Sequence, residues 1–142
     1  MNDLRAHFYS TLKANSTLTG LLGGVGQIRH RELPSEPYLT AAAPGILVFS
    51  LIGLGPRSGG RANAEQDSGQ LSIDIYARRT WLAWQIVYQI ESTIGNTTAT
   101  KATYRFLTLN RASLNDLGID PGLKCPHINV TYDIGGIFKN SG

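Results

Sequence analysis

The chain has 142 residues, of which 42% are hydrophobic and 16% are charged, a composition typical of one globular domain. Its formal net charge is only +3, with basic and acidic residues interspersed, which argues against a dedicated nucleic-acid-binding surface. The single cysteine, Cys125, excludes an internal disulfide. We therefore expect one domain over residues 1–142 that is held together by a hydrophobic core.

Two helical segments are expected at the start of the chain. Leu4, Phe8 and Leu12 recur at four-residue steps and predict an amphipathic helix over residues 3–13. A shorter helical turn follows Ser16 and should end at Gly23-Gly24. The same N-terminal stretch carries charged residues where a signal peptide would have an apolar core, so we expect synthesis in the cytoplasm.

The segment 27–43 contains two prolines and predicts a connector with at most one short extended piece. Residues 45–52 are apolar on both faces and predict a central strand. Residues 70–78 alternate between apolar and polar side chains, as a half-buried strand does. Two further strands are expected at 104–111 and 127–134.

A helix is expected over residues 80–95, with Thr80 as N-cap and Gly95 as its stop. One wide face of this helix is apolar and is made by Leu82, Ala83, Ile86, Val87, Ile90 and Ile94. Its second side carries the aromatic residues Trp81, Trp84 and Tyr88. Either the N-terminal helix covers these aromatic residues, or they form an interface with another subunit, where Trp and Tyr are common anchors.

The order of these elements is helix, short helix, strand, strand, helix, strand, strand. Such an order predicts an α+β fold with a four-stranded, mainly antiparallel sheet and helices packed on one face.

A loop of 17 residues with five glycines is expected at 53–69, between two strands. Its segment 55–62 resembles a phosphate-binding loop, but Arg61 replaces the required lysine, Ala62 replaces the hydroxyl residue, and a strand follows in place of a helix. We therefore expect no nucleotide site. The loop should be mobile in the isolated subunit and ordered against a neighbour; the alternative is a simple flexible hairpin tip.

Other candidate chemistry is incomplete. A zinc site from His30, Glu32, Cys125 and His127 would lack the second thiolate of a deaminase, so a buried structural cysteine is the better interpretation. The segment 115–122 has too few carboxylates for a calcium loop and predicts turns. We expect no catalytic, cofactor-binding or metal-binding residues and no enzymatic activity.

Three stretches carry a resemblance to a known family: STLTGLLGGVGQIRH (16–30), PGILVFSLIG (44–53) and QLSIDIYAR (70–78), the last leading into an aliphatic helix. Over about residues 3–134 the chain resembles the tail terminator, or tail completion, proteins of long-tailed bacteriophages. The resemblance implies a small α+β subunit that forms a ring, usually a hexamer, on the tail tube. Such a ring stops tube polymerisation and joins the tail to the head connector, without cofactors.

The resemblance also implies which residues make contacts. The long hairpin loop corresponds to a contact region of this family, so Arg57 and Arg61 are expected at the interface with tail components. Trp81, Trp84 and Tyr88 remain candidates for the interface with another subunit on the helical pattern alone. The expected partners are further copies of the chain, the tail tube protein and a head connector or neck protein, all in the virion. DNA would pass through the ring without specific binding, and no membrane is involved.

Two alternatives remain open from the sequence. The first is another neck or head-completion protein, or a subunit of the tail tube itself. The second is a small single-stranded nucleic-acid module that stacks bases on strand aromatics such as Tyr76, Tyr104 or Phe106.

Overall fold

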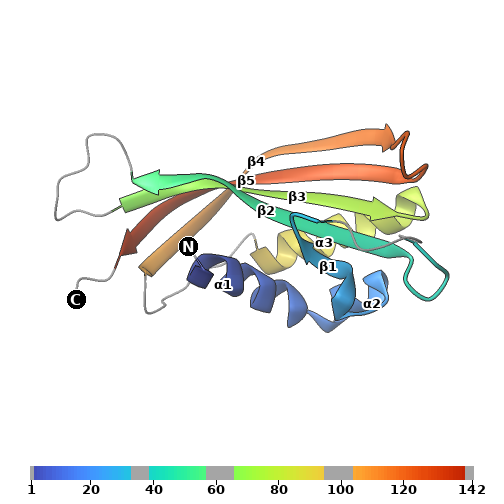
Figure 1. Ribbon diagram of the computed structural model, residues 1–142, viewed down its shortest axis with the longest axis horizontal. Coiled ribbons are helices and arrows are strands. Elements are labelled where there is room, and N and C mark those ends of the chain that lie inside the picture. Colours follow the sequence, from blue (N-terminus) through green and yellow to red (C-terminus); the bar gives the residue numbers. More distant parts are fainter. Residues whose placement is uncertain (1, 33–38, 57–65, 95–103, 140–142) are drawn as a thin grey trace.

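The strands form one five-stranded sheet with the spatial order β1-β2-β3-β5-β4 (Figure 1). The computed structural model describes residues 2–32, 39–56, 66–94 and 104–139. The strands are β1 (Ile28–His30), β2 (Gly45–Pro56), β3 (Gln66–Ala77), β4 (Tyr104–Ile119) and β5 (Pro126–Lys139). The pair β1 and β2 is parallel, and all other pairs are antiparallel.

The expectation of four strands is wrong by one, because part of the predicted connector joins the sheet as β1. Ile28 lies opposite Leu47 and is only 2% exposed, so this short strand contributes to the core. The N–H of Arg31 then donates to the carbonyl of Phe49 at 3.0 Å. A three-residue strand is too short to produce a recognisable alternation in the sequence.

The predicted loop at 53–69 is also shorter than expected. Strand β2 continues to Pro56 and β3 begins at Gln66, with an irregular register after Ile52. The predicted boundaries of this loop are therefore wrong. The remainder of the loop, with its predicted mobility and the two arginines Arg57 and Arg61, lies outside the described residues.

Three α-helices accompany the sheet: α1 (Asn2–Lys13), α2 (Ser16–Leu22) and α3 (Thr80–Ile94). The side chain of Asn15 caps α2 by accepting a hydrogen bond from the N–H of Leu18 at 3.0 Å. Gly23 ends this helix in the left-handed conformation, with φ of 97°, as the sequence predicts. A 3-10 turn at Val25–Gln27 leads into β1.

The core lies between the three helices and one face of the sheet (Figure 1). The alternation predicted for β3 is confirmed, because Leu71, Ile73, Ile75 and Ala77 are all fully buried. Helices α1 and α2 add fully buried side chains to the same cluster: Phe8, Leu12, Leu18 and Leu22. Each large apolar side chain buried in this way contributes about 1.5–3 kcal/mol.

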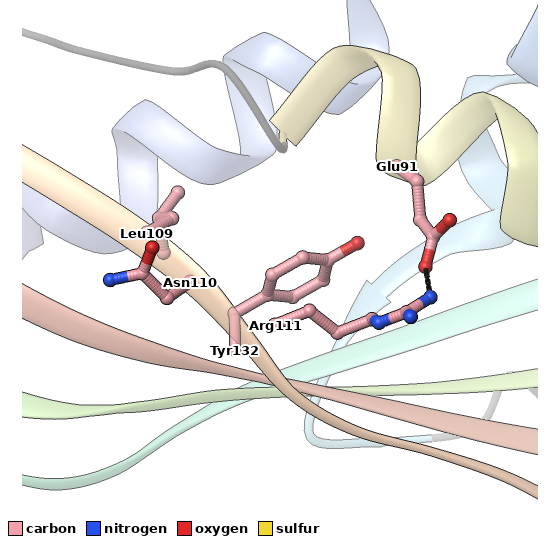
Figure 2. Close-up of a pocket in the computed structure, with 5 residues that line it drawn as sticks. All are labelled: Glu91, Leu109, Asn110, Arg111 and Tyr132. Atoms are coloured by element: carbon pink, nitrogen blue, oxygen red, sulfur yellow. Dashed lines mark hydrogen bonds and ion pairs between the residues drawn. The ribbon is translucent and has the colours of Figure 1, made fainter.

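Helix α3 has the buried face that its periodicity predicts. The buried side chains of this helix are Leu82, Ala83, Ile86, Val87, Ile90 and Ile94. Near its C-terminal end, Glu91 forms an ion pair with Arg111 of β4 (Figure 2). Both side chains are partly exposed, so this pair adds little stability, but it joins the helix to the edge of the sheet.

Candidate interaction surface

The aromatic side chains of α3 lie on the outside of the molecule. Trp81 is 58% exposed, Trp84 is 40% exposed and Tyr88 is 69% exposed. Their spacing of three and four residues places them on one side of the helix, away from the side that faces the sheet. The three rings therefore form a continuous exposed stripe.

The N-terminal helices do not cover this stripe. Phe8 and Leu12 of α1 are fully buried in the core under the sheet. The side-chain amide of Asn15 donates to Thr93 Oγ1 at 2.6 Å and to Gln89 Oε1 at 3.3 Å, which fixes the α1–α2 junction beside the C-terminal half of α3. The expectation that the N-terminal helix covers Trp81, Trp84 and Tyr88 is therefore wrong.

Two arginines extend the aromatic stripe at its N-terminal end. Arg78 and Arg79 are both exposed and directly precede α3. Cations are unfavourable at a helix N-terminus, so these residues do not stabilise α3. Arg and Trp are, however, enriched together in protein interfaces. We refer to Arg78, Arg79, Trp81, Trp84 and Tyr88 as the α3 surface.

The two arginines of the α3 surface were missed by sequence reasoning, although their position next to Trp81 was a usable signal. The predicted contact residues Arg57 and Arg61 lie outside the described part of the chain.

A second group of exposed apolar side chains lies at the end of β4. Leu117 is 52% exposed and Ile119 is 62% exposed. Within the described residues, β4 pairs with β5 on one side and is an edge strand on the other. An edge strand with exposed apolar side chains can accept another polypeptide.

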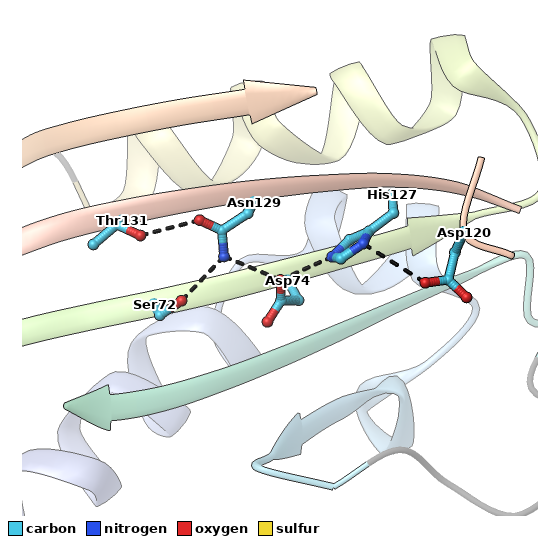
Figure 3. A network of polar contacts seen from close by, with 6 residues as sticks. All are labelled: Ser72, Asp74, Asp120, His127, Asn129 and Thr131. Carbon is cyan, nitrogen blue, oxygen red and sulfur yellow. Dashed lines mark hydrogen bonds and ion pairs between the residues drawn. The ribbon is translucent and has the colours of Figure 1, made fainter. Parts of the chain in front are cut away.

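The face of the sheet that points away from the helices carries a polar network, formed by Ser72, Asp74, Asp120, His127, Asn129 and Thr131 (Figure 3). His127 Nε2 lies 2.8 Å from Asp74 Oδ1. The Asn129 amide donates to Ser72 Oγ and to Asp74 Oδ1, both at 3.0 Å. Thr131 Oγ1 in turn donates to Asn129 Oδ1 at 3.1 Å.

This network links β3 to β5 and is not arranged as a catalytic triad. The hydroxyls of Ser72 and Thr131 contact Asn129, whereas His127 contacts Asp74 and stacks on the Tyr76 ring with centroids 4.2 Å apart. A nucleophile activated by His127 would need to lie within hydrogen-bond distance of it. Sequence reasoning missed the network because the strand register, which places His127 next to Tyr76, cannot be seen in the sequence.

Cys125 is buried, with 5% of its surface exposed, so the predicted burial of this cysteine is confirmed. Burial, together with the nearby carboxylate of Asp120, raises the pKa of its thiol, so it stays protonated and unreactive. The turn predicted at Asp120 is confirmed, because Asp120 Oδ2 accepts from the N–H of Leu123 at 2.7 Å. The turn predicted at Asn115-Asp116 is wrong, because both residues belong to β4, where Asp116 accepts from the N–H of Gly118 at 2.9 Å beside an irregularity in the strand register.

Two further classes of feature do not occur within the described ranges. No group of three His, Cys, Asp or Glu residues there is placed to hold a metal ion. None of the described helices combines the length and apolar character that crossing a membrane requires.

Comparison with known proteins shows the fold. No protein-family model matches the sequence, and no curated protein matches it either. Among solved structures, the chain is similar to a chain of the "Virion of native gene transfer agent (GTA) particle", with a TM-score of 0.61 and 14% sequence identity. The match covers 93% of this chain and 91% of that chain. The two proteins therefore share a fold over nearly their whole lengths.

Proposed function

We propose that this protein is a structural subunit of a phage-like virion, without catalytic activity, and that it acts as a tail terminator. Copies of the chain assemble into a ring, a hexamer, on the head-facing end of the tail tube. The ring stops tube polymerisation and joins the tail to the head connector. The shared fold with a chain of a virion particle supports the structural class, and the sequence resemblance supports the terminator role.

The observation that carries this proposal is the exposure of the α3 surface. Trp81, Trp84 and Tyr88 present large apolar rings to solvent in the isolated chain, and such rings dominate the free energy of protein association when they are buried. A ring needs two different patches on each subunit, because its contacts are heterologous. The α3 surface and the exposed edge of β4 are two such patches.

The proposal also specifies partners and location. The neighbours are further copies of the chain, the tail tube protein and a head connector or neck protein. The protein is made in the host bacterial cytoplasm and resides in the virion. DNA passes through the ring without specific binding, in keeping with a net charge of only +3.

The test compares the assembly of the wild-type protein with that of the triple variant Trp81→Ser, Trp84→Ser, Tyr88→Ser, measured by light scattering with and without purified tail tubes. We expect the wild type to form a ring, alone or on tube ends, and the variant to stay monomeric. Circular dichroism should show both proteins folded, because none of the three side chains belongs to the core. The exposed Thr17 of α2, which is not part of the α3 surface, provides a control, and Thr17→Ser should assemble normally.

Two results would contradict the terminator role. A wild-type protein that remains monomeric and does not bind tail tube ends excludes a ring at that position. Spontaneous polymerisation into long tubes identifies a tube subunit instead, which is the nearest alternative within the same structural class.

A further inference from the structure

A cavity of about 330 Å³ opens between the C-terminal half of α3 and the strands β4 and β5. Its lining residues are Glu91, Leu109, Asn110, Arg111 and Tyr132 (Figure 2). Glu91 lies one helical turn beyond Tyr88, so the cavity adjoins the α3 surface without sharing its residues.

Tyr132 is the unusual member of this lining. The residue is only 2% exposed, yet its hydroxyl has no hydrogen-bond partner in the part of the chain that the structure describes. Burial, reinforced by the negative charge of Glu91, raises the pKa of Tyr132 although Arg111 opposes the shift. The phenol is therefore neutral at physiological pH and keeps a proton to donate. A buried hydroxyl without a partner is destabilising, so a ligand that supplies the partner gains free energy.

The charges around the cavity exclude most classes of ligand. Glu91 and Arg111 are paired, so the site has no net charge to attract an ion. Arg111 would attract an anion, but a carboxylate has no proton to donate to Glu91 and is opposed by the negative end of the α3 dipole. Glu91 would attract a cation, but an ammonium group has no lone pair to accept hydrogen bonds from Tyr132 and Arg111. A neutral polar group remains. It has to accept hydrogen bonds from Tyr132 and Arg111 and donate one to the carboxylate of Glu91.

An amide meets all of these requirements, because its carbonyl oxygen accepts and its N–H donates. We propose that this cavity binds a neutral amide group of a polypeptide. The same chemistry is offered by the side chains of Asn and Gln and by the peptide group of the main chain. The cavity is a recognition site in its own right, and its existence does not depend on ring formation.

The test titrates the full-length, isotope-labelled protein with four small probes and follows the NMR signals of the Tyr132 ring and the Arg111 guanidinium. Acetamide represents the side-chain amide and N-methylacetamide the peptide group, while acetate and methylammonium are the charged counterparts. For probes of this size we expect dissociation constants on the order of 10–100 mM for the amides. The dissociation constants of the charged probes should be at least about fivefold higher, because each charged probe leaves one hydrogen-bonding group of the cavity without a partner. The amide probe that binds more tightly shows whether the natural ligand is a side-chain amide or a main-chain peptide group.

The variant Tyr132→Phe separates ligand binding from a purely structural role. Removal of the hydroxyl should weaken amide binding by about three- to tenfold, the value of one hydrogen bond. It should leave the melting temperature unchanged or raise it, because an unpaired buried hydroxyl is lost. The control Tyr76→Phe, on the opposite face of the sheet, should bind amides like the wild type.

Three outcomes would overturn the proposal. The first is the absence of saturable shifts at Tyr132 and Arg111 with either amide. The second is tighter binding of acetate or methylammonium than of the amides. The third is a fall of the melting temperature by more than about 3 °C in Tyr132→Phe, which would reveal that the hydroxyl already has a partner within the chain.

Discussion

Gly23 occupies a position that only glycine tolerates. Its φ of 97° lies in the left-handed region, and a Cβ atom would sit 2.3 Å from the carbonyl oxygen of Ala42 and 2.5 Å from Cα of Ala43. Both neighbours are main-chain atoms, which cannot rotate away. The left-handed conformation alone costs a residue with a Cβ about 1–2 kcal/mol. The close approach of the two segments therefore depends on this residue.

We predict that Gly23→Ala lowers the free energy of unfolding by about 3 kcal/mol, the sum of backbone strain and main-chain displacement. Urea denaturation followed by circular dichroism measures the loss. Gly20→Ala is the matched control, because a Cβ at Gly20 would meet nothing within 4 Å inside the same helix. Gly20→Ala should stabilise the protein by about 0.5–1 kcal/mol. Equal effects of the two substitutions would contradict the described turn.

The phenol of Tyr76 predicts a pH dependence of stability. Burial, followed by the charges of Asp74, Asp120 and Cys125, raises the pKa of Tyr76 from 10.0 to about 12. The unfolded chain therefore loses this proton at lower pH than the folded protein does. The contribution of Tyr76 is complete below pH 10 and disappears as the pH rises to about 12.

We accordingly expect the free energy of unfolding to fall between pH 10 and pH 12, and to fall less steeply in the variant Tyr76→Phe. Chemical denaturation at several alkaline pH values measures both slopes. Tyr88→Phe, which removes an exposed phenol, is the matched control. A wild-type slope in Tyr76→Phe would exclude the interpretation.

At the scale of elements, Asn15 joins α2 to α3. Its side-chain oxygen caps α2, and its side-chain amide nitrogen contacts Thr93 and Gln89 of α3. A single residue thus sets both the start of one helix and its position against another. These bonds add to the apolar packing that places α1 and α2 beside α3.

The variants Asn15→Ala and Asn15→Asp separate the two roles. Asn15→Ala removes both the cap of α2 and the hydrogen bonds to α3, so it should lower the free energy of unfolding by about 2 kcal/mol. Asn15→Asp keeps the capping oxygen but cannot donate to Thr93, so it should cost about 1 kcal/mol. Thermal and urea denaturation measure the two values. If Asn15→Ala is as stable as the wild type, neither the cap nor the hydrogen bonds to α3 contribute.

At the scale of the whole molecule, both tryptophans of the chain lie on the outside of one helix. We predict that acrylamide strongly quenches their fluorescence in the isolated subunit. Assembly should protect them and shift their emission to shorter wavelength, because the rings become buried at the subunit contact. Tryptophans that stay equally accessible in an assembled ring would show that the contact lies elsewhere on the surface.

The periodic elements could be predicted because each carries its own signal. The 3.6-residue period over 80–95 separates the buried face of α3 from Trp81, Trp84 and Tyr88, and the two-residue period does the same for β3. The short extended piece allowed within 27–43 is β1, but its place in the sheet could not be predicted, since its three residues join only through the parallel pairing with β2. The extension of β2 and β3 into a glycine-rich stretch likewise depends on pairing between strands and not on side-chain pattern.

The sequence by itself determined the α+β class, the two faces of α3 and the glycine stop at Gly23, because each of these depends on neighbours along the chain. Only the tertiary structure decided that the aromatic stripe is exposed and that Glu91, Arg111 and Tyr132 line one cavity. These features bring together residues from separate elements. Their positions follow from how α3 packs on the sheet and from the register of β4 and β5, which no local pattern specifies.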